Sequence, residues 1–477
     1  MSRKLFLFCI IAAMLLLSCY ASAEILKPSV DFSHGKLNVS QNNRFLVHAD
    51  GTPFFYLGDT AWELFHRLNR EEAEKYLENR RQKGFTVIQT VALAELDGLR
   101  VPNAYGHRPL LETDGKFDPA KPDIKDGPNN DYWDHVDFIV KTANEKGLYI
   151  GFLPTWGDKW NKIWGKGPEV FTPENARAYS KFLGKRYKDA QLIWILGGDR
   201  NPGSDKHMAI TDAMAEGLIE GDGGSHLLTF HPQGGSTSTT WFNKKDWLSF
   251  NMLQSGHGGW DIPNYKMIEH DYNLSPRKPC LDGEPRYENH PVNWKADEGW
   301  FDDRDVRQAL YWSVFAGGCG VTYGCHDIWQ MMNTGKEPIA VVRNNWYEAI
   351  DLPGAFDVIH LRRLIESRPM LDRVPDQSII ASGQTDGPDH IQATRGKDYA
   401  FIYIPYGNPF EITLGKISGE KVKAYWFNPR EGYATLIGTL DNRGKKKFDP
   451  PSEIAKGNDW VLVLDDASKN YPAPGTN

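Results

Sequence analysis

Long apolar runs alternate with amphipathic segments over most of the chain. The apolar runs occupy residues 53–62, 85–93, 148–157, 191–201, 226–235, 248–259, 278–288 and 319–329. Continuous apolar runs are typical of parallel strands that are buried on both faces. Eight strand–helix units in a row predict a closed (β/α)8 barrel, or TIM barrel, rather than an open doubly wound sheet.

The segments between these runs predict helices. Residues 69–84 carry acids early, bases late and a closing glycine, as helix-dipole and C-cap preferences require. Further helices are expected at residues 132–147, 172–189, 206–220, 265–272, 302–318 and 356–366, with a short one near Trp241. No GxGxxG motif follows the first strand, which disfavours a dinucleotide-binding domain.

After residue 369 the pattern changes to short alternating strands separated by turn residues. Such a pattern predicts a small antiparallel β-sandwich. We therefore divide the chain into a leader at residues 1–23, a barrel domain at 24–368 that begins with a β-hairpin near 35–53, and an all-β domain at 369–477. The hairpin is expected to pair with the all-β domain or to cover the lower face of the barrel.

The first residues have the pattern of an export signal. Arg3 and Lys4 precede an apolar run that is too short for a membrane-spanning helix, and no later run is apolar enough to span a bilayer. "ASA" at residues 21–23 fits ordinary signal-peptidase cleavage, whereas "LLSC" would place a lipid anchor on Cys19. We expect export to the periplasm or outer envelope of a bacterium.

Composition narrows the class of ligand. The net charge is −7 with a pI near 6.1, which argues against a nucleic-acid partner. Aromatic residues make up 12% of the chain, and such rings can stack on sugar faces as well as fill a core. The cysteines form neither a disulfide framework nor a zinc pattern. We expect no metal and no cofactor. We also expect a monomer.

Polar and aromatic residues recur where the predicted strands end. In (β/α)8 enzymes the chemistry lies at the C-terminal ends of the strands. The candidates for this mouth, in chain order, are Asp59, Trp62, Gln89, Trp156, Asp199, Arg200, His231, His257, Glu284, Arg286, His326 and Trp329.

Asp199 and Glu284 are the candidate catalytic pair. Two carboxyl groups can split a glycosidic bond when one protonates the leaving oxygen and the other attacks or activates water. We expect Arg286 to keep Glu284 ionised, Gly283 to leave space for the sugar, and Asp282 to be a structural partner. The long segment at residues 96–131 is expected to be irregular and to wall the cleft.

The motifs "FYLGDTAWELF", "WILGGDRN" and "CLDGEPRYE", together with the β-rich tail, resemble the apiosidase-like proteins of glycoside hydrolase family 140. The resemblance covers roughly residues 36–465. It implies a retaining endo-apiosidase that acts on apiose side chains of the pectin rhamnogalacturonan II, with Asp199 as acid/base and Glu284 as nucleophile. The wider clan has Asn-Glu where this chain has Gly198-Asp199. The tail resembles a collagen-binding type of module, although no residue in it indicates collagen.

Two other classes fit parts of the pattern. His231, His257 and Asp327 follow strands where amidohydrolase-type barrels carry metal ligands, but the first strand lacks the His-x-His of those enzymes. A non-catalytic sugar-binding protein could use the same aromatic mouth, with the acids as hydrogen-bond acceptors.

Overall fold

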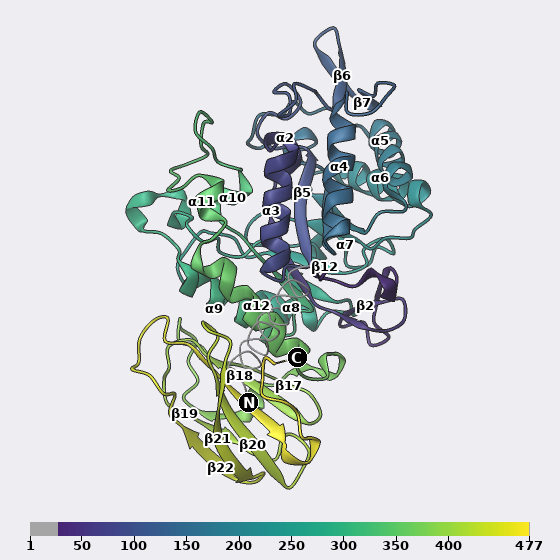
Figure 1. Cartoon of the computed structure of the whole chain (residues 1–477). Helices are drawn as coiled ribbons and strands as arrows, with labels where there is room; N and C mark the ends of the chain where they lie inside the picture. The colour runs from purple at the N-terminus through teal and green to yellow at the C-terminus, as the bar shows by residue number, and fades with distance from the viewer. Residues whose placement is uncertain (1–26, 477) are drawn as a thin grey trace, which may run out of the picture.

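The computed structural model describes residues 27–476, and Figure 1 shows an α/β part joined to an all-β part. The predicted signal peptide and Cys19 lie outside the described residues. Within residues 27–476, no helix combines the length and apolar character needed to cross a bilayer. Cys280, Cys319 and Cys325 are buried free thiols.

Eight parallel strands wall the barrel, each where an apolar run predicts it. They are β4 (Tyr56–Thr60), β5 (Val87–Leu93), β8 (Tyr149–Thr155), β9 (Leu192–Gly197), β10 (Leu228–His231), β12 (Asn251–Gln254), β13 (Cys280–Asp282) and β14 (Gly320–Tyr323). The last strand pairs in parallel with the first. Two hydrogen bonds join the wall between β10 and β12. The Ser249 amide donates to the Leu228 carbonyl at 2.8 Å, and the Thr229 hydroxyl donates to the Phe250 carbonyl at 2.7 Å. The predicted (β/α)8 architecture is confirmed.

Helices surround these strands, and Figure 1 shows α3 and α4 flanking β5. They are α2 (Leu64–Arg67), α3 (Arg70–Gln82), α4 (Tyr132–Glu145), α5 (Pro173–Tyr187), α6 (Asp205–Asp222), α7 (Thr239–Phe242), α8 (Asn264–Tyr272), α9 (Asp303–Phe315), α10 (His326–Trp329), α11 (Trp346–Ala349) and α12 (Pro353–Glu366). Capping boxes begin α3, α5, α9 and α11: in α3 the Asn69 side chain accepts from the Glu72 amide, and the Glu72 side chain accepts from the Asn69 amide. Such pairs fix a helix start by satisfying donors that have no partner within the helix.

The N-terminal hairpin has a third strand. β1 (Leu37–Val39), β2 (Leu46–His48) and β3 (Pro53–Phe54) form an antiparallel sheet. The rings of Phe54 and His48 pack at 5.3 and 6.5 Å from Tyr149, the first residue of β8. Because parallel strands all start at the same end of a barrel, this sheet covers the end opposite the expected active site, as predicted.

Residues 96–131 are more regular than expected. They contain the antiparallel hairpin of β6 (Leu110–Thr113) and β7 (Lys116–Pro122), at the top of Figure 1. No residue of this segment lines the main cavity described below, but Leu96, Asp97, Val101 and Pro102 line a neighbouring pocket that shares Ile339 with it, so the segment borders the cavity without forming its wall. The apolar–polar pattern is too short in each strand to distinguish a hairpin from a loop.

The C-terminal domain is all-β, as predicted. Its strands are β15 (Val374–Pro375), β16 (Ile380–Ser382), β17 (Gln392–Arg395), β18 (Tyr399–Ile404), β19 (Phe410–Thr413), β20 (Lys421–Phe427), β21 (Ala434–Asp441), β22 (Lys445–Phe448) and β23 (Trp460–Asp466). They form a six-stranded sheet and a three-stranded sheet, with their own core that includes Ile402, Ile412 and Leu462.

Buried ion pairs join this domain to the barrel. Arg307 of α9 donates to the Asp459 carboxylate at 3.1 and 3.2 Å, and Arg368 donates to Asp465 at 2.8 and 2.7 Å. Breaking a buried pair by removing one partner costs about 3–5 kcal/mol, because the other charge stays buried. The all-β domain therefore packs against the barrel as a fixed neighbour.

Candidate active site

The turn after β9 positions Asp199. Gly197, Gly198 and Asp199 have φ values of 95°, 81° and 56°. A Cβ on Gly197 would lie 2.2 Å from the His231 carbonyl oxygen, and one on Gly198 would lie 2.8 Å from the Gly157 amide nitrogen. Only glycine fits the first two positions, and aspartate is among the few residues that tolerate the third. The Gly-Gly-Asp sequence thus determines where this carboxyl group points.

The surroundings of Asp199 favour its neutral form. The pKa of its carboxyl group is raised to about 7, first because burial removes water from the carboxylate and then because Glu284 carries charge nearby. The Arg200 guanidinium opposes this shift, with Nη1 at 3.1 Å from Asp199 Oδ2, but it does not overcome it. A carboxyl group with a pKa near 7 can deliver a proton at neutral pH.

The end of β13 forms a rigid platform under Glu284. The buried Asp282 carboxylate accepts from the Ser255 hydroxyl at 2.6 Å, the Asn264 amide group at 3.2 Å and the Glu284 backbone amide at 3.3 Å. These bonds fix the peptide that carries Glu284. The expectation that Asp282 is a structural partner is confirmed.

Gly283 is required by packing rather than by the sugar. A Cβ there would lie 2.6 Å from both Cγ and Sδ of Met252, inside the barrel wall. The Gly283 carbonyl also accepts from Gln89 Nε2 at 3.0 Å. The expectation that this glycine leaves space for substrate is therefore wrong, because its open side faces β12.

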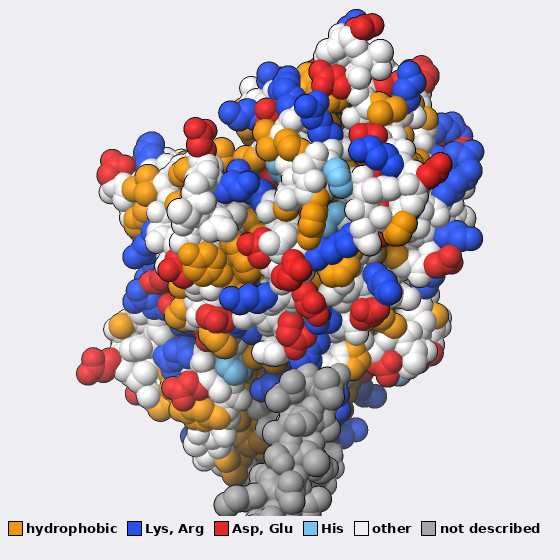
Figure 2. Space-filling view, turned by 45° about the horizontal axis from the view of Figure 1, so that its top comes forward, with side chains coloured by type: hydrophobic (Ala, Val, Ile, Leu, Met, Phe, Trp, Pro, Cys, Tyr) orange, Lys and Arg blue, Asp and Glu red, His pale blue; other side chains and the backbone are white. Residues whose placement is uncertain are grey.

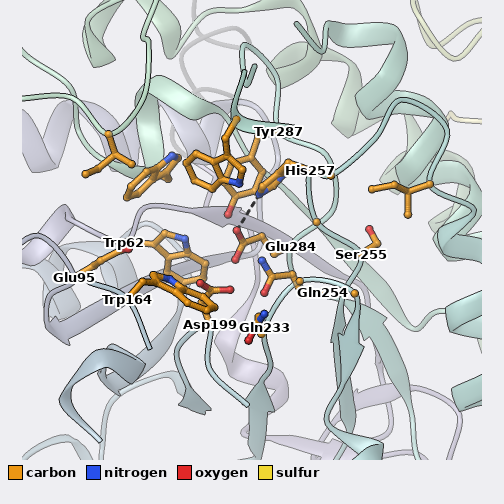
Figure 3. A pocket seen from close by; sticks show the side chains of 18 of the residues that line it. Trp62, Glu95, Trp164, Asp199, Gln233, Gln254, Ser255, His257, Glu284 and Tyr287 are labelled. Carbon is orange, nitrogen blue, oxygen red and sulfur yellow. Dashed lines mark hydrogen bonds and ion pairs between the residues drawn. The ribbon is translucent and has the colours of Figure 1, made fainter. Parts of the chain in front are cut away.

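Two histidines hold Glu284 in its ionised form. His257 Nε2 lies 3.1 Å from Oε1, drawn as the dashed line in Figure 3, and His231 Nε2 lies 3.0 Å from Oε2. Burial alone would raise the pKa of Glu284, but the contacts with His231 and His257 outweigh burial and lower it to about 2. A carboxylate of this kind is suited to nucleophilic attack.

His231 also links the two strand ends. The Asp199 backbone amide donates to its Nδ1 at 3.4 Å, and its Nε2 lies 3.0 Å from Glu284 Oε2. One imidazole thus contacts both the turn that carries Asp199 and the carboxylate of Glu284.

Arg286 does not have the role that its position in the sequence suggested. Its fully buried guanidinium donates from Nη1 to the Trp260 carbonyl and, at 3.0 Å, to Gln308 Oε1. Side chains two residues apart in an extended segment share a face only while the strand continues, and β13 ends at Asp282. The histidines, not Arg286, hold Glu284 ionised, and Arg286 does not line the cavity.

Asp199 and Glu284 share a cavity of about 760 Å³. Trp62, Trp156, Trp164, Trp294 and Trp329 contribute rings to its wall, and no lysine or arginine of residues 27–476 lines it. Figure 3 shows Asp199 and Glu284 near its centre, with Trp62 and Trp164 on one side and Gln233 and Gln254 on the other. Flat apolar rings with a few polar groups between them are typical of sugar-binding sites.

Half of the predicted site residues line this cavity. These are Trp62, Trp156, Asp199, His257, Glu284 and Trp329. The other six are Asp59, Gln89, Arg200, His231, Arg286 and His326, and each is buried behind the wall.

Arg200 and His231 contact Asp199 and Glu284 from behind the cavity wall, and the other four contact the surrounding barrel. Asp59 accepts from the Tyr76 hydroxyl at 2.5 Å and from Arg80 Nε at 2.6 Å, so it points toward α3. Its expected contact with substrate is thereby excluded, because alternate residues of a strand point to opposite faces. His326 Nδ1 accepts from Trp329 Nε1 at 3.2 Å and so supports a ring that does line the cavity.

Several lining residues are not among those that the sequence predicts. They are Glu95, Trp164, Gln233, Gln254, Tyr287 and Trp294. Gln254 is the last residue of β12, and Glu95 comes two residues after the end of β5, so both follow the rule that strand ends supply the site. Gln89, the residue that the sequence suggested for this strand end, lies inside β5.

The arrangement does not favour a metal-assisted hydrolase. His231 and His257 contact Glu284, whereas the Asp327 carboxylate accepts from Asn289 Nδ2 at 2.9 Å and from the Arg343 amide at 3.1 Å. Across residues 27–476, no three His, Cys, Asp or Glu side chains are placed to hold a metal ion together.

A family model for the apiosidase-like catalytic domain matches residues 40–372. The chain belongs to the apiosidase-like family. A second model, described as "Putative collagen-binding domain of a collagenase", matches residues 374–465 of this apiosidase-like protein. A search of curated protein sequences finds no match.

Solved structures place this apiosidase-like protein among glycoside hydrolases. One, described as a glycoside hydrolase, is 39% identical, with a TM-score of 0.86, over 94% of this chain and 100% of its own. Another, described as a glycoside hydrolase family 5 protein from Bacteroides vulgatus, is 36% identical, with a TM-score of 0.86, over 93% of this chain and 96% of its own. The apiosidase-like chain is a glycoside hydrolase.

Proposed function

We propose that this glycoside hydrolase cleaves its substrate with retention of configuration, with Glu284 as nucleophile and Asp199 as acid/base. The observation that carries the proposal is the opposite tuning of two carboxyl groups in one cavity. The pKa of Glu284 is lowered to about 2 and that of Asp199 is raised to about 7, so one is ionised and the other protonated over the range between.

Glu284 attacks the anomeric carbon as the bond to the leaving oxygen breaks, and Asp199 transfers its proton to that oxygen. A covalent glycosyl ester on Glu284 results. Asp199, now a carboxylate, takes a proton from water, which attacks the same carbon and releases Glu284. The ester removes the charge that helped to raise the pKa of Asp199, so this pKa falls and Asp199 stays ionised at neutral pH, ready to take the proton from water. Such a mechanism requires carboxyl groups about 5–5.5 Å apart.

We propose apiose in pectic rhamnogalacturonan II as the sugar whose linkage is cleaved, with endo action. Membership of the apiosidase-like family supports this substrate. The cavity is consistent with a neutral sugar, since aromatic rings and carboxyl groups line it without a cation.

The proposed site of action is outside the cytoplasm. The basic start and apolar run of residues 1–23 support export, and Cys19 supports a lipid anchor as one route to the envelope. Figure 2 shows acidic and basic side chains interspersed over the face in view. Mass spectrometry of the mature N-terminus tests the route, because Glu24 as first residue indicates a soluble protein and a lipidated Cys19 an anchored one.

Product analysis tests the proposal as a whole. Rhamnogalacturonan II oligosaccharides with and without apiose are incubated with the enzyme, and ¹H NMR records the first anomer released. We expect cleavage only of the apiose-bearing chains, with the anomer of the substrate linkage appearing first. Initial release of the opposite anomer would refute retention, and cleavage of apiose-free chains alone would refute the substrate.

A further inference from the structure

A third carboxyl group, that of Glu95, faces the cavity. Its backbone is fixed on both sides: Lys159 Nζ donates to the Ala94 carbonyl at 2.6 Å, and the Leu96 amide donates to Glu63 Oε1 at 2.9 Å. Both supporting side chains are fully buried. The peptide that carries Glu95 is therefore as firmly placed as the two catalytic strand ends.

The supports of Glu95 are themselves paired. Asp158 Oδ1 accepts from Lys159 Nζ at 2.7 Å, and Glu63 Oε2 accepts from His66 Nδ1 at 2.6 Å. Two buried pairs thus hold one short segment in place. Buried pairs of this kind contribute little net stability, so their positioning effect is the more informative property.

The Glu95 carboxyl group, in contrast, has no protein partner. No described side chain or amide donates to it, although it is only partly exposed and lines the cavity. Figure 3 shows it beside Trp62, on the far side of Asp199 from Gln233 and Gln254. A polar group that the fold holds at a cavity wall without a partner is placed to bind a ligand.

Charge decides which kind of ligand fits. Burial, and then the nearby charges of Asp199 and Asp158, raise the pKa of Glu95 well above its ordinary value, so a neutral Glu95 can both donate and accept. With the ionised Glu284 on the wall and no lysine or arginine among the lining residues, a carboxylate-bearing sugar would be repelled. Hydroxyl groups of an uncharged sugar can both donate to and accept from Glu95, and they carry no charge that the wall would repel.

We propose that Glu95 is a specificity-determining residue that hydrogen-bonds hydroxyl groups of an uncharged sugar unit lying against Trp62 and Trp164. This inference rests on the proposed glycosidase function and adds to it the part of the wall that selects the sugar. Glu95 takes no part in bond cleavage, because Asp199 and Glu284 already supply the proton and the nucleophile.

The test combines binding with turnover. In the Glu284→Gln background, calorimetry with an apiose-bearing rhamnogalacturonan II oligosaccharide measures affinity without cleavage. Adding Glu95→Ala should weaken binding by about tenfold to hundredfold, the value of one or two hydrogen bonds to a buried polar group. Glu95→Gln should lose tenfold or less, because an amide also donates and accepts. In an otherwise normal enzyme, Glu95→Ala should change KM more than kcat and leave the melting temperature unchanged.

A matched control separates this role from general electrostatics. Glu337→Gln removes an exposed carboxylate that lines the neighbouring pocket but not the main cavity, and should change neither binding nor KM. If the wild-type enzyme cleaves the oligosaccharide and Glu95→Ala binds it as tightly as its parent, the inference about Glu95 is overturned and the proposed function stands. If wild type cleaves nothing but binding depends on Glu95, the proposed function is overturned and the inference about Glu95 stands. If wild type cleaves nothing and the Glu284→Gln protein binds nothing, both are overturned.

Discussion

Asp199 and Glu284 share one cavity, yet the strand ends that carry them are built in opposite ways. Asp199 ends a turn of three left-handed residues, with its side chain 19% exposed and beside a second carboxylate. Glu284 follows a strand end fixed by Asp282 and lies between two imidazoles. The difference shows that residue type alone does not assign roles, since the surroundings suit one acid to the proposed donor role and the other to the proposed nucleophile role.

The largest effect is expected at the more rigid strand end. Glu284→Gln removes the attacking oxygen while keeping the shape of the side chain, so kcat should fall by roughly 10⁴-fold or more. Steady-state kinetics on the oligosaccharide measures this, with circular dichroism as the check on folding. A variant that retains a tenth of the wild-type rate would show that the nucleophile lies elsewhere.

At the other strand end the loss should be smaller and should depend on the leaving group. Asp199→Ala removes the proton donor, so kcat should fall by about 10²–10⁴-fold on the natural linkage. The fall should be much smaller for an aryl glycoside whose leaving group needs no proton. Equal losses on both substrates would contradict a donor role, and Asp199→Asn, which tolerates the left-handed backbone, controls for distortion of the turn.

The histidine contacts predict a change in pH dependence. Glu284 must be ionised, so kcat/KM falls as pH drops through its pKa, which His231 and His257 lower. His257→Gln should raise that pKa and move the acidic limb of the pH profile to higher pH. On that limb, kcat/KM should be about tenfold lower than in the wild-type enzyme. The alkaline limb, set by Asp199, should stay near pH 7.

Arg286→Lys is the matched control, because Arg286 contacts the Trp260 carbonyl and Gln308 rather than Glu284. Its acidic limb should not move. An acidic limb that shifts in Arg286→Lys but not in His257→Gln would restore the role that the sequence suggested for this arginine.

The smallest effect concerns stability. The pKa of Asp199 is raised from 3.8 to about 7 in the folded state, so its favourable contribution is complete below about pH 4 and is lost as pH rises through 7. Asp199→Asn should therefore raise the free energy of unfolding at pH 8 by at most about 4 kcal/mol, at about 1.4 kcal/mol per pKa unit. The gain should shrink toward pH 4 in urea denaturation series. A gain that is independent of pH would point to packing instead.

The sequence predicts the two strand ends unequally. The eight apolar runs place β9 and β13, and with them Asp199 and Glu284, because burial on both faces leaves a clear signal. The direction of a single side chain leaves no such signal in the sequence. Arg286, beyond the end of β13, turns away from Glu284, and Asp59, within β4, faces Arg80. His231 and His257 come from other strands, so only the folded barrel shows that they meet at Glu284.

Chemical rescue tests the central claim most directly, because it probes both carboxyl groups through the stereochemistry of one product. Glu284→Ala and Asp199→Ala are each supplied with azide and an activated apioside, and NMR identifies the glycosyl azide formed. We predict that Glu284→Ala gives the inverted azide, because the anion replaces the missing nucleophile. Asp199→Ala should give the retained azide, because the anion attacks the ester on Glu284. The opposite assignment, or rescue of neither variant alongside an active wild type, would contradict the account.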